Sequence, residues 1–280
     1  MLQNMGGYFS TPSQQRIYNL KSDDENDFGE VLNVEVTKLP SFVDLRSGMP
    51  AVYDQGTLGS CTANAIAGAF EYDLSEYDLP AEERFIPSRL FIYYHERIRE
   101  NSIYQDSGAR IVDGIRSVEE QGVCSEEKWP YIEKNFEEKP CEECYEEAKL
   151  NRVLSAFKVN DLNHMKCALC HGLPVIMGVQ VYESFEKASG GHIPLPNTSQ
   201  EKLLGGHAIL AVGYDESQKC VFFRNSWGVS WGDKGYGTLP YDFITSFAYS
   251  FWVIRTVSFL NDDVPVLENN EEVEYDSSSE

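Results

Sequence analysis

The sequence predicts an α+β protein in which a mainly helical part precedes a part built from an antiparallel sheet. Up to about residue 150, apolar residues recur at helical spacing. Beyond it they alternate, or form short apolar runs bounded by Gly and Pro, as strands do. With 280 residues, of which 42% are hydrophobic, the chain can bury a core in one large domain or in two lobes that share a cleft.

Helices are predicted in the first part from apolar faces. Ala63, Ala67 and Phe70 share one face of a helix that begins near residue 61. A second helix has its apolar face within 111–118 and ends at Gly122.

Strands are predicted in the second part, as an antiparallel sheet or barrel. The segments that carry this pattern are "VLSAFKV", "PVIMGVQVY", "HAILAVGY", "KCVFFRN" and "FWVIRTV". Residues 21–30 and the last twenty residues are polar and aperiodic, as expected of solvated segments outside the core.

The charge balance excludes some partners. A formal net charge of −22 repels nucleic acid and anionic lipid surfaces, so we expect neither as a partner. No export signal or membrane-spanning run of apolar residues is visible, so we expect action in the cytoplasm or inside a viral particle. The seven cysteines are then expected to be reduced thiols. Oligomeric state and natural substrate do not follow from the sequence.

Cys61 is the first candidate for chemistry. It lies where the loop "DQGTLGS" meets a predicted helix. Unpaired N–H groups and the partial positive charge of a helix N-terminus stabilise a thiolate. Since such surroundings lower a cysteine pKa from ~8.5 to as little as ~3–4, we expect Cys61 to be an ionised nucleophile if a base is near.

His207 and Asn225 are the candidate partners of Cys61. "LLGGHAILAVGYD" places His207 at the start of an apolar strand, after two glycines that permit close approach of a substrate. Asn225 ends the strand before "SWGVSWGDKGYG". We expect Asn225 to accept the Nδ1–H of His207, leaving Nε2 to face the thiol.

Together these residues resemble the papain family of cysteine peptidases. The similarity runs from "LPSFVDLRSGMPAVYDQGTLGSC" through "GGHAILAVGYD" to "NSWGVSWGDKGYG". It implies a papain-like two-lobe fold with the active-site cleft between a helical lobe and an antiparallel β-barrel lobe. On this basis residues 1–38 resemble a propeptide, 39–150 form the helical lobe, 151–260 form the β-barrel lobe and 261–280 form an acidic tail.

The resemblance also implies roles for single residues. Cys61 corresponds to the nucleophile, His207 to the general acid and base, and Asn225 to the residue that orients the imidazole. Gln55 corresponds to the side chain that donates to the oxyanion, a donor worth ~3–4 kcal/mol. The residues expected to contact substrate or shield the site are Gly108, Ala208 and Trp227. No cofactor or metal is needed.

The sequence departs from papain at three positions. Thr62 follows the nucleophile where an aromatic residue is usual, as in a "CTANA" subgroup with bacterial and viral members. Leu58 stands where close relatives have a disulfide-forming cysteine, which fits a reducing compartment. Gly206 precedes the histidine in place of an acidic or amide residue. The sequence also lacks a cathepsin B-type loop, which favours endopeptidase action.

Two other functions remain open. An acyl transferase would use the same Cys61, His207 and Asn225. Alternatively the pairs "CEEC" (Cys141, Cys144) and "CALC" (Cys167, Cys170), with His164 and His171 beside the second, have zinc-ligand spacing. The second pair and Cys144 of the first fall in apparent helices, so ordinary thiols are favoured over a zinc-binding interaction protein.

The first 38 residues suggest a latent zymogen. They carry three basic and six acidic residues, and the body is also acidic. Docking must then rest on apolar anchors and backbone pairing, and we expect added salt to strengthen it. We expect residues from about 8 to 20 to cover the cleft, and a cut between about 28 and 40 to release activity. The expected anchors are Tyr8, Phe9, Ile17, Tyr18 and Leu20.

Overall fold

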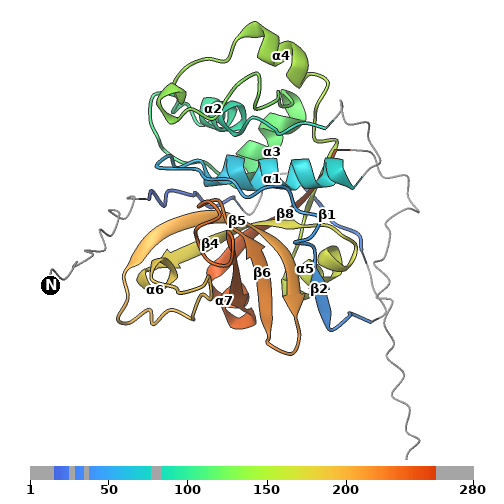
Figure 1. Ribbon diagram of the computed structural model, residues 1–280, viewed down its shortest axis with the longest axis vertical. Helices are drawn as coiled ribbons and strands as arrows, with labels where there is room; N and C mark the ends of the chain where they lie inside the picture. Colours follow the sequence, from blue (N-terminus) through green and yellow to red (C-terminus); the bar gives the residue numbers. More distant parts are fainter. Residues whose placement is uncertain (1–15, 25–28, 35–37, 77–83, 257–280) are drawn as a thin grey trace, which may run out of the picture.

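A computed structural model describes residues 16–24, 29–34, 38–76 and 84–256 of the chain. Helices α1 to α4 form an upper layer, and a mixed sheet with helices α5 to α7 forms a lower one (Figure 1). The expected anchors Tyr8 and Phe9 and the acidic tail lie outside the described residues.

The helices among the described residues are α1 (Cys61–Ser75), α2 (Arg89–Arg99), α3 (Ile111–Glu120), α4 (Glu142–Ala148), α5 (Leu162–Cys170), α6 (Glu183–Glu186) and α7 (Tyr241–Phe247), with a 3₁₀ turn at Glu133–Asn135. The strands are β1 (Glu30–Val31), β2 (Phe42–Asp44), β3 (Ser155–Lys158), β4 (Val175–Tyr182), β5 (Leu203–Asp215), β6 (Cys220–Arg224), β7 (Tyr236–Pro240) and β8 (Ala248–Arg255). Each of the helices and strands predicted from periodicity lies at its expected place in the chain.

The strands form one sheet in the order β1-β3-β8-β4-β5-β6-β7, with β2 paired to β5. All of these pairs are antiparallel except β1 with β3. The predicted barrel is wrong in one respect, since β1 and β7 remain the ends of an open path among the described strands. Both β1 and β2 precede the helical region in sequence, yet they pair with strands of the second half.

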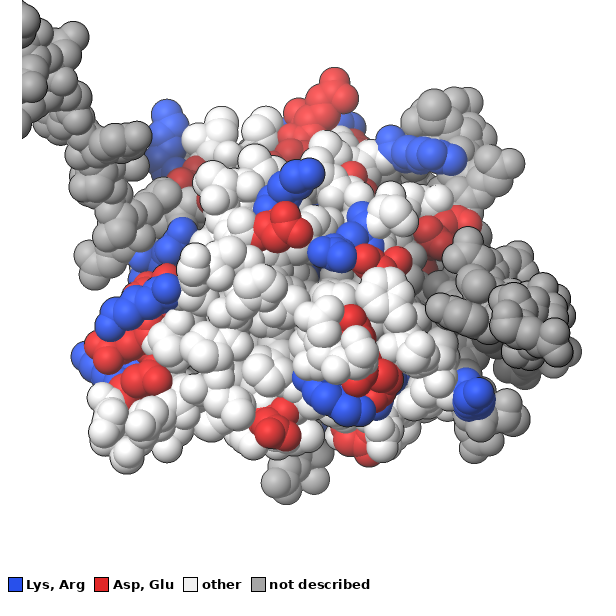
Figure 2. Space-filling model, turned by 60° about the horizontal axis from the view of Figure 1, so that its bottom comes forward, with Lys and Arg blue, Asp and Glu red and all other residues white. Residues whose placement is uncertain are grey.

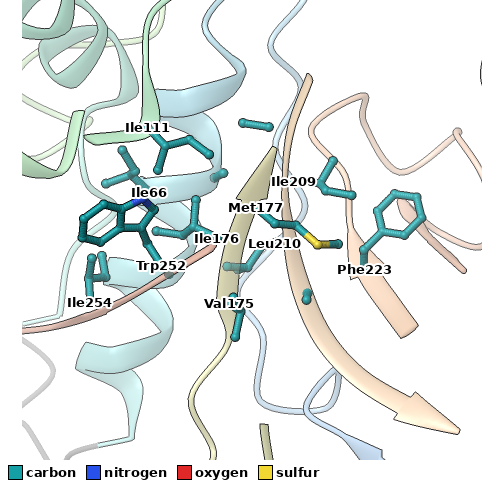
Figure 3. Close-up of a cluster of buried hydrophobic side chains, with 14 of the residues drawn as sticks. Ile66, Ile111, Val175, Ile176, Met177, Ile209, Leu210, Phe223, Trp252 and Ile254 are labelled. Atoms are coloured by element: carbon teal, nitrogen blue, oxygen red, sulfur yellow. The ribbon is translucent and has the colours of Figure 1, made fainter. Parts of the chain in front are cut away.

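Helix α1 lies between the sheet and the helices α2 and α3 (Figure 1). Its first ten residues, "CTANAIAGAF", are all buried. Small side chains permit this close packing, because a Cβ on Gly68 would lie 2.5 Å from a guanidinium nitrogen of Arg224 in β6. Figure 3 shows Ile66 of α1 beside Ile111 of α3 and Trp252 of β8, so one core joins both layers.

The charges on one face of the protein agree with the expectation that nucleic acid and anionic lipid are not partners. On the face in Figure 2, Lys and Arg side chains lie beside Asp and Glu side chains and do not gather into a basic patch. Among the described residues, the helices are too short or too polar to cross a membrane.

Candidate active site

Cys61 lies where α1 contacts β5, the strand that carries His207. Cys61 is the first residue of α1 and is 1% exposed. His207 is also 1% exposed and lies in the middle of the sheet, where it pairs with Val179 of β4. The backbone N–H of Ala208, the next residue in β5, donates to the Cys61 sulfur. The structure therefore brings the helix N-terminus and the histidine strand together.

Asn225 fixes the proton on His207. The His207 Nε2 lies 2.9 Å from Asn225 Oδ1, and the same oxygen accepts the backbone N–H of Ser226 at 2.8 Å. Because Oδ1 only accepts, His207 Nε2 carries the proton and Nδ1 holds a lone pair. The prediction that Nδ1 bonds Asn225 and Nε2 faces the thiol is therefore wrong. Nε2 bonds Asn225, and Nδ1 has no partner within the described chain.

Trp227 covers the histidine from one side. Its ring stacks on that of His207, with centroids 4.8 Å apart and planes 24° apart. Both Trp227 and Asn225 are buried, so the bond between His207 and Asn225 is kept from water. A hydrogen bond is electrostatically stronger in such surroundings.

Gln55 is held at both ends of its amide. Its Nε2 donates to the carbonyl of Leu58 at 2.8 Å, and its Oε1 accepts from Ser226 Oγ at 2.6 Å. Its backbone is fixed as well, since the carbonyl accepts from the Tyr131 hydroxyl at 2.8 Å. One N–H of the Gln55 side chain stays available for an oxyanion.

The Tyr131 hydroxyl also lies 2.6 Å from the Oγ of Ser60, the residue before Cys61. Asn64 of α1 donates to Ser60 in turn, at 3.1 Å. Sequence reasoning missed this network. It joins residues 71 to 76 positions apart, and no local pattern marks Tyr131.

Thr62, the departure noted after the nucleophile, has a buried partner. Its hydroxyl donates to Glu96 Oε2 of α2 at 2.7 Å. Glu96 is fully buried, and burial raises the pKa of its carboxyl to about 8. A protonated carboxyl therefore lies directly beneath the N-terminus of α1 at neutral pH.

The cleft is occupied by the chain's own residues 16–24. The ring of Tyr18 meets His207 and Trp227 edge-on, with centroids 6.3 and 6.1 Å apart. Leu20 is buried and donates its N–H to the carbonyl of Gly206 at 3.2 Å. In Figure 1 this segment passes between the upper helices and the sheet.

Gly108 permits the segment to lie close. Its φ of +64° favours glycine, and a Cβ there would lie 2.2 Å from the carbonyl oxygen of Asn19. The next residue, Ala109, accepts the N–H of Lys21 at 3.1 Å. Ala208, by contrast, is buried under the segment and touches Cys61 through its backbone.

Burial changes the ionisation expected for the covered site. It raises the pKa of the Cys61 thiol to about 12 and lowers the pKa of His207 to about 4. Both groups are therefore neutral at pH 7 while residues 16–24 are in place. Cys61 is therefore a thiol in the covered site and not the predicted thiolate. Where water is excluded, the cost of burying a charged sulfur outweighs its stabilisation by the helix N-terminus.

The two CxxC pairs do not meet in one site. The Cys141 and Cys144 sulfurs are 3.2 Å apart at the start of α4, whereas Cys170 of α5 contacts Tyr214. Within residues 16–24, 29–34, 38–76 and 84–256, no group of three or more His, Cys, Asp or Glu side chains is arranged to hold a metal.

Comparison with known proteins identifies the family. The profile of the papain family cysteine proteases matches residues 39–244. The chain belongs to this family. Its members are proteases, so this chain is a hydrolase that acts on proteins or peptides.

Two relatives share more than a third of their residues with this protease. An uncharacterized peptidase C1-like protein of Acanthamoeba polyphaga mimivirus is 42% identical over 219 residues, which are 73% of this chain and 70% of that protein. Xylellain, a cysteine protease from Xylella fastidiosa, matches with a TM-score of 0.80 at 37% identity, over 89% of this chain and 100% of xylellain. A proCathepsin B from Trypanosoma congolense, at 15% identity and a TM-score of 0.70, shows the fold alone, over 87% of each chain.

Thiol labelling of this papain-family protease tests the covered site. With residues 16–24 in place, we expect an alkylating reagent at pH 7 to modify exposed Cys141 first and buried, neutral Cys61 much later. Peptide mapping at timed intervals measures this order, and the urea-unfolded chain, where accessibility is equal, is the control. Faster labelling of Cys61 than of Cys141 in the folded full chain would contradict the covered site.

The buried carboxyl of Glu96 predicts a pH-dependent stability. Its folded pKa, about 8, lies above the ordinary value of 4.5, so its stabilising contribution is complete below pH ~4.5 and is lost as pH rises through about 8. Glu96→Gln lacks this titration. We expect its melting temperature to rise relative to that of the parent between pH 5 and pH 9, both in a Cys61→Ala background that prevents self-cleavage. A difference that stays constant with pH would show that Glu96 is not buried as a neutral acid.

Proposed function

We propose that this protease is a cysteine endopeptidase that works through Cys61, His207 and Asn225 and a thioester intermediate. The observation that carries the proposal is the bond between His207 Nε2 and Asn225 Oδ1, which leaves a basic Nδ1 on the strand that contacts Cys61. The viral and bacterial relatives, at 42% and 37% identity, support a place in the subgroup suggested by the "CTANA" sequence.

The reaction follows from these positions. The Cys61 sulfur attacks the peptide carbonyl while its proton passes to His207 Nδ1. The side-chain N–H of Gln55 and the backbone N–H of Cys61 stabilise the oxyanion. His207 then protonates the leaving amine, and the thioester remains. A water molecule that gives its proton to Nδ1 hydrolyses the thioester and restores the thiol.

Neither alternative has a supporting observation in the part of the chain that the structure describes. An acyl transferase would pass the thioester to an amine, and product analysis with added amine distinguishes the two reactions. A zinc-binding protein would retain its function after Cys61 is blocked.

Substitutions test the assigned roles in the uncovered enzyme, a chain that begins at Leu39. We expect Cys61→Ala and His207→Ala to lower kcat/KM by at least ~10³-fold, because each removes a group that bonds or moves a proton. We expect Gln55→Ala to lower kcat by roughly 10²–10³-fold through loss of an oxyanion donor. Asn225→Ala removes only orientation and costs less.

Peptide hydrolysis rates measure these effects. Gln200→Ala, in the exposed loop before β5, is the matched control for an amide-to-alanine change. A His207→Ala enzyme within tenfold of the parent would exclude the proposed base.

The same site is proposed to be latent while residues 16–24 lie over it. Tyr18 stands edge-on to His207, and its hydroxyl donates to Glu186 at 2.5 Å. The Asn19 side chain donates to the carbonyl of Asp106 at 2.9 Å, close to Gly59 and Gly108. These contacts occupy the space that a peptide needs to reach Cys61.

Charge contributes to docking more than net charge suggests. Lys21 forms an ion pair with Glu100, and Asp24 lies 3.3 Å from Arg110. These local pairs attract although segment and body are both acidic overall. We therefore reverse the expected effect of salt and predict that screening weakens docking. The effect should be modest, since exposed pairs contribute little.

Truncations test latency and locate its cause. Because β1 pairs with β3 and Leu32 is buried, residues 29–34 belong to the sheet as well as to the N-terminal part. We therefore compare the full chain with chains that begin at Gly29 and at Leu39. Both shorter chains should turn over a peptide at least tenfold faster than the full chain. Equal rates in all three would show that residues 16–24 do not inhibit.

Point variants of the full chain test whether inhibition depends on single contacts in the cleft or only on the presence of the N-terminal residues. Leu20→Ala removes a buried side chain, a loss of about 2 kcal/mol or more of docking, and should raise activity of the full chain. Ile17→Ala is its control, because Ile17 is 38% exposed. If the full chain with Leu20→Ala is as inactive as the parent while the chain that begins at Leu39 is active, contacts other than that of Leu20 cause the inhibition.

A further inference from the structure

Asp23 of the N-terminal segment is bound by two donors from different elements of the protease. Its Oδ1 accepts the backbone N–H of Val112, in the first turn of α3, at 3.2 Å. Its Oδ2 accepts Nε1–H of Trp252 in β8 at 2.8 Å. One carboxylate therefore joins the helical layer to the sheet at the end of the segment away from His207.

The donors belong to the body of the protease and are suited to an anion. Helix α3 has no side-chain cap of its own, so Asp23 stands at the positive end of its dipole. Trp252 is 1% exposed, and Asp23 is the acceptor recorded for its N–H within the described chain. An indole N–H is a donor only and does not rotate, so its direction is fixed by the core packing seen in Figure 3.

Two basic side chains lie beside the donors of this site. The ammonium of Lys158 lies 5.6 Å from the centre of the Trp252 ring, and the Arg110 guanidinium bonds Asp113 at 2.7 Å beside the same helix terminus. The nearby acids are matched, since Asp113 is shared by Arg110 and Arg99 and Glu100 pairs with Lys21. Asp23, Lys158 and Trp252 line a hollow that opens to the surface.

We propose that, once residues 16–24 leave the cleft, these donors form a carboxylate-binding subsite that takes an acidic side chain of the peptide substrate. The inference rests on the proposed function, because it requires that the segment and a substrate use the same cleft. Without residues 16–24, the Trp252 N–H and the Val112 N–H lose the acceptor that Asp23 gives them and are left to water. A substrate carboxylate restores both bonds, and charged acceptors form stronger bonds here than an amide does.

The segment gives the spacing of the acid from a neighbouring apolar residue. Leu20 is buried near Gly178, Gly206 and Tyr249, and Asp23 lies three residues further along the chain. Tyr18, near His207, lies on the other side of Leu20. The preferred substrate should therefore carry an acid two to four residues from the apolar residue that fills the Leu20 position, on the side away from the cleaved bond.

Binding to an inactive enzyme tests the subsite without turnover. The probe is a peptide of residues 16–24, titrated into the Cys61→Ala chain that begins at Gly29, which keeps β1 and the contact of Gly29 with Trp252. Asp23→Asn in the peptide should weaken binding at least fivefold, whereas Asp24→Asn, whose side chain is 82% exposed, should weaken it less than twofold. Equal weakening by both, or none by Asp23→Asn, would overturn the subsite.

Turnover then shows whether substrates use it. The active chain that begins at Gly29, which keeps β1, is given peptides that contain one leucine. In each peptide one position, two to four residues from the leucine, carries Asp or Asn. At one position Asp should raise kcat/KM at least fivefold over Asn, and Trp252→Phe should abolish that ratio while a melting curve confirms folding. Asn peptides cleaved as fast as Asp peptides at every position would refute the subsite in an active protease. If no peptide is cleaved, the proposed function fails, and the binding comparison still decides the subsite.

Discussion

The close contact of α1 with β5 is the constraint on which the active site depends. Cys61 begins α1 and His207 lies in β5, so the two reach each other only if the helix packs against the sheet along its length. The run of small residues in α1 permits this, and Gly68 leaves room for Arg224 from β6. Arg224 is itself buried and donates to the carbonyl of Ala51 at 2.5 Å, which ties the sheet to the loop before Gln55. Packing and chemistry therefore depend on the same helix.

The oxyanion side of the site rests on a different kind of support. Gln55 lies in a loop, where side chains usually have more freedom than on a helix. Here Ser226, next to Asn225, accepts the Gln55 backbone N–H and donates to its side chain. Asn225, the proposed orienting residue, and Gln55, the proposed oxyanion donor, are thus fixed through neighbouring positions in one turn after β6. A displacement of this turn would disturb both functions together, because Ser226 is shared.

Much of this arrangement follows from the sequence, and the exceptions have physical reasons. Hydrophobic periodicity located α1 and β5, and the spacing of motifs pointed to Cys61, His207 and Asn225. Which imidazole nitrogen faces Asn225 depends on a side-chain rotation that no spacing encodes. The open sheet depends on which strands pair at its ends, and the parallel pairing of β1 with β3 joins segments more than a hundred residues apart. The hydrogen bonds of Tyr131 also join residues far apart in the chain, and hydroxyl bonding partners produce no periodic pattern in the sequence.

The ionisation of Cys61 differed from expectation for a reason that bears on latency. A helix N-terminus favours a thiolate, but its effect is small beside the cost of charging a sulfur that water cannot reach. Residues 16–24 supply that exclusion, since Tyr18 lies against the His207 ring and Leu20 is buried beside Gly206. In the proposed latent state the segment therefore blocks the cleft in two ways, by filling the substrate's space and by keeping thiol and imidazole neutral. In this proposal, departure of the segment admits water, which lowers the pKa of Cys61, raises the pKa of His207 and so favours the ion pair. The proposal thereby couples access and activation through the same few residues, 16–24.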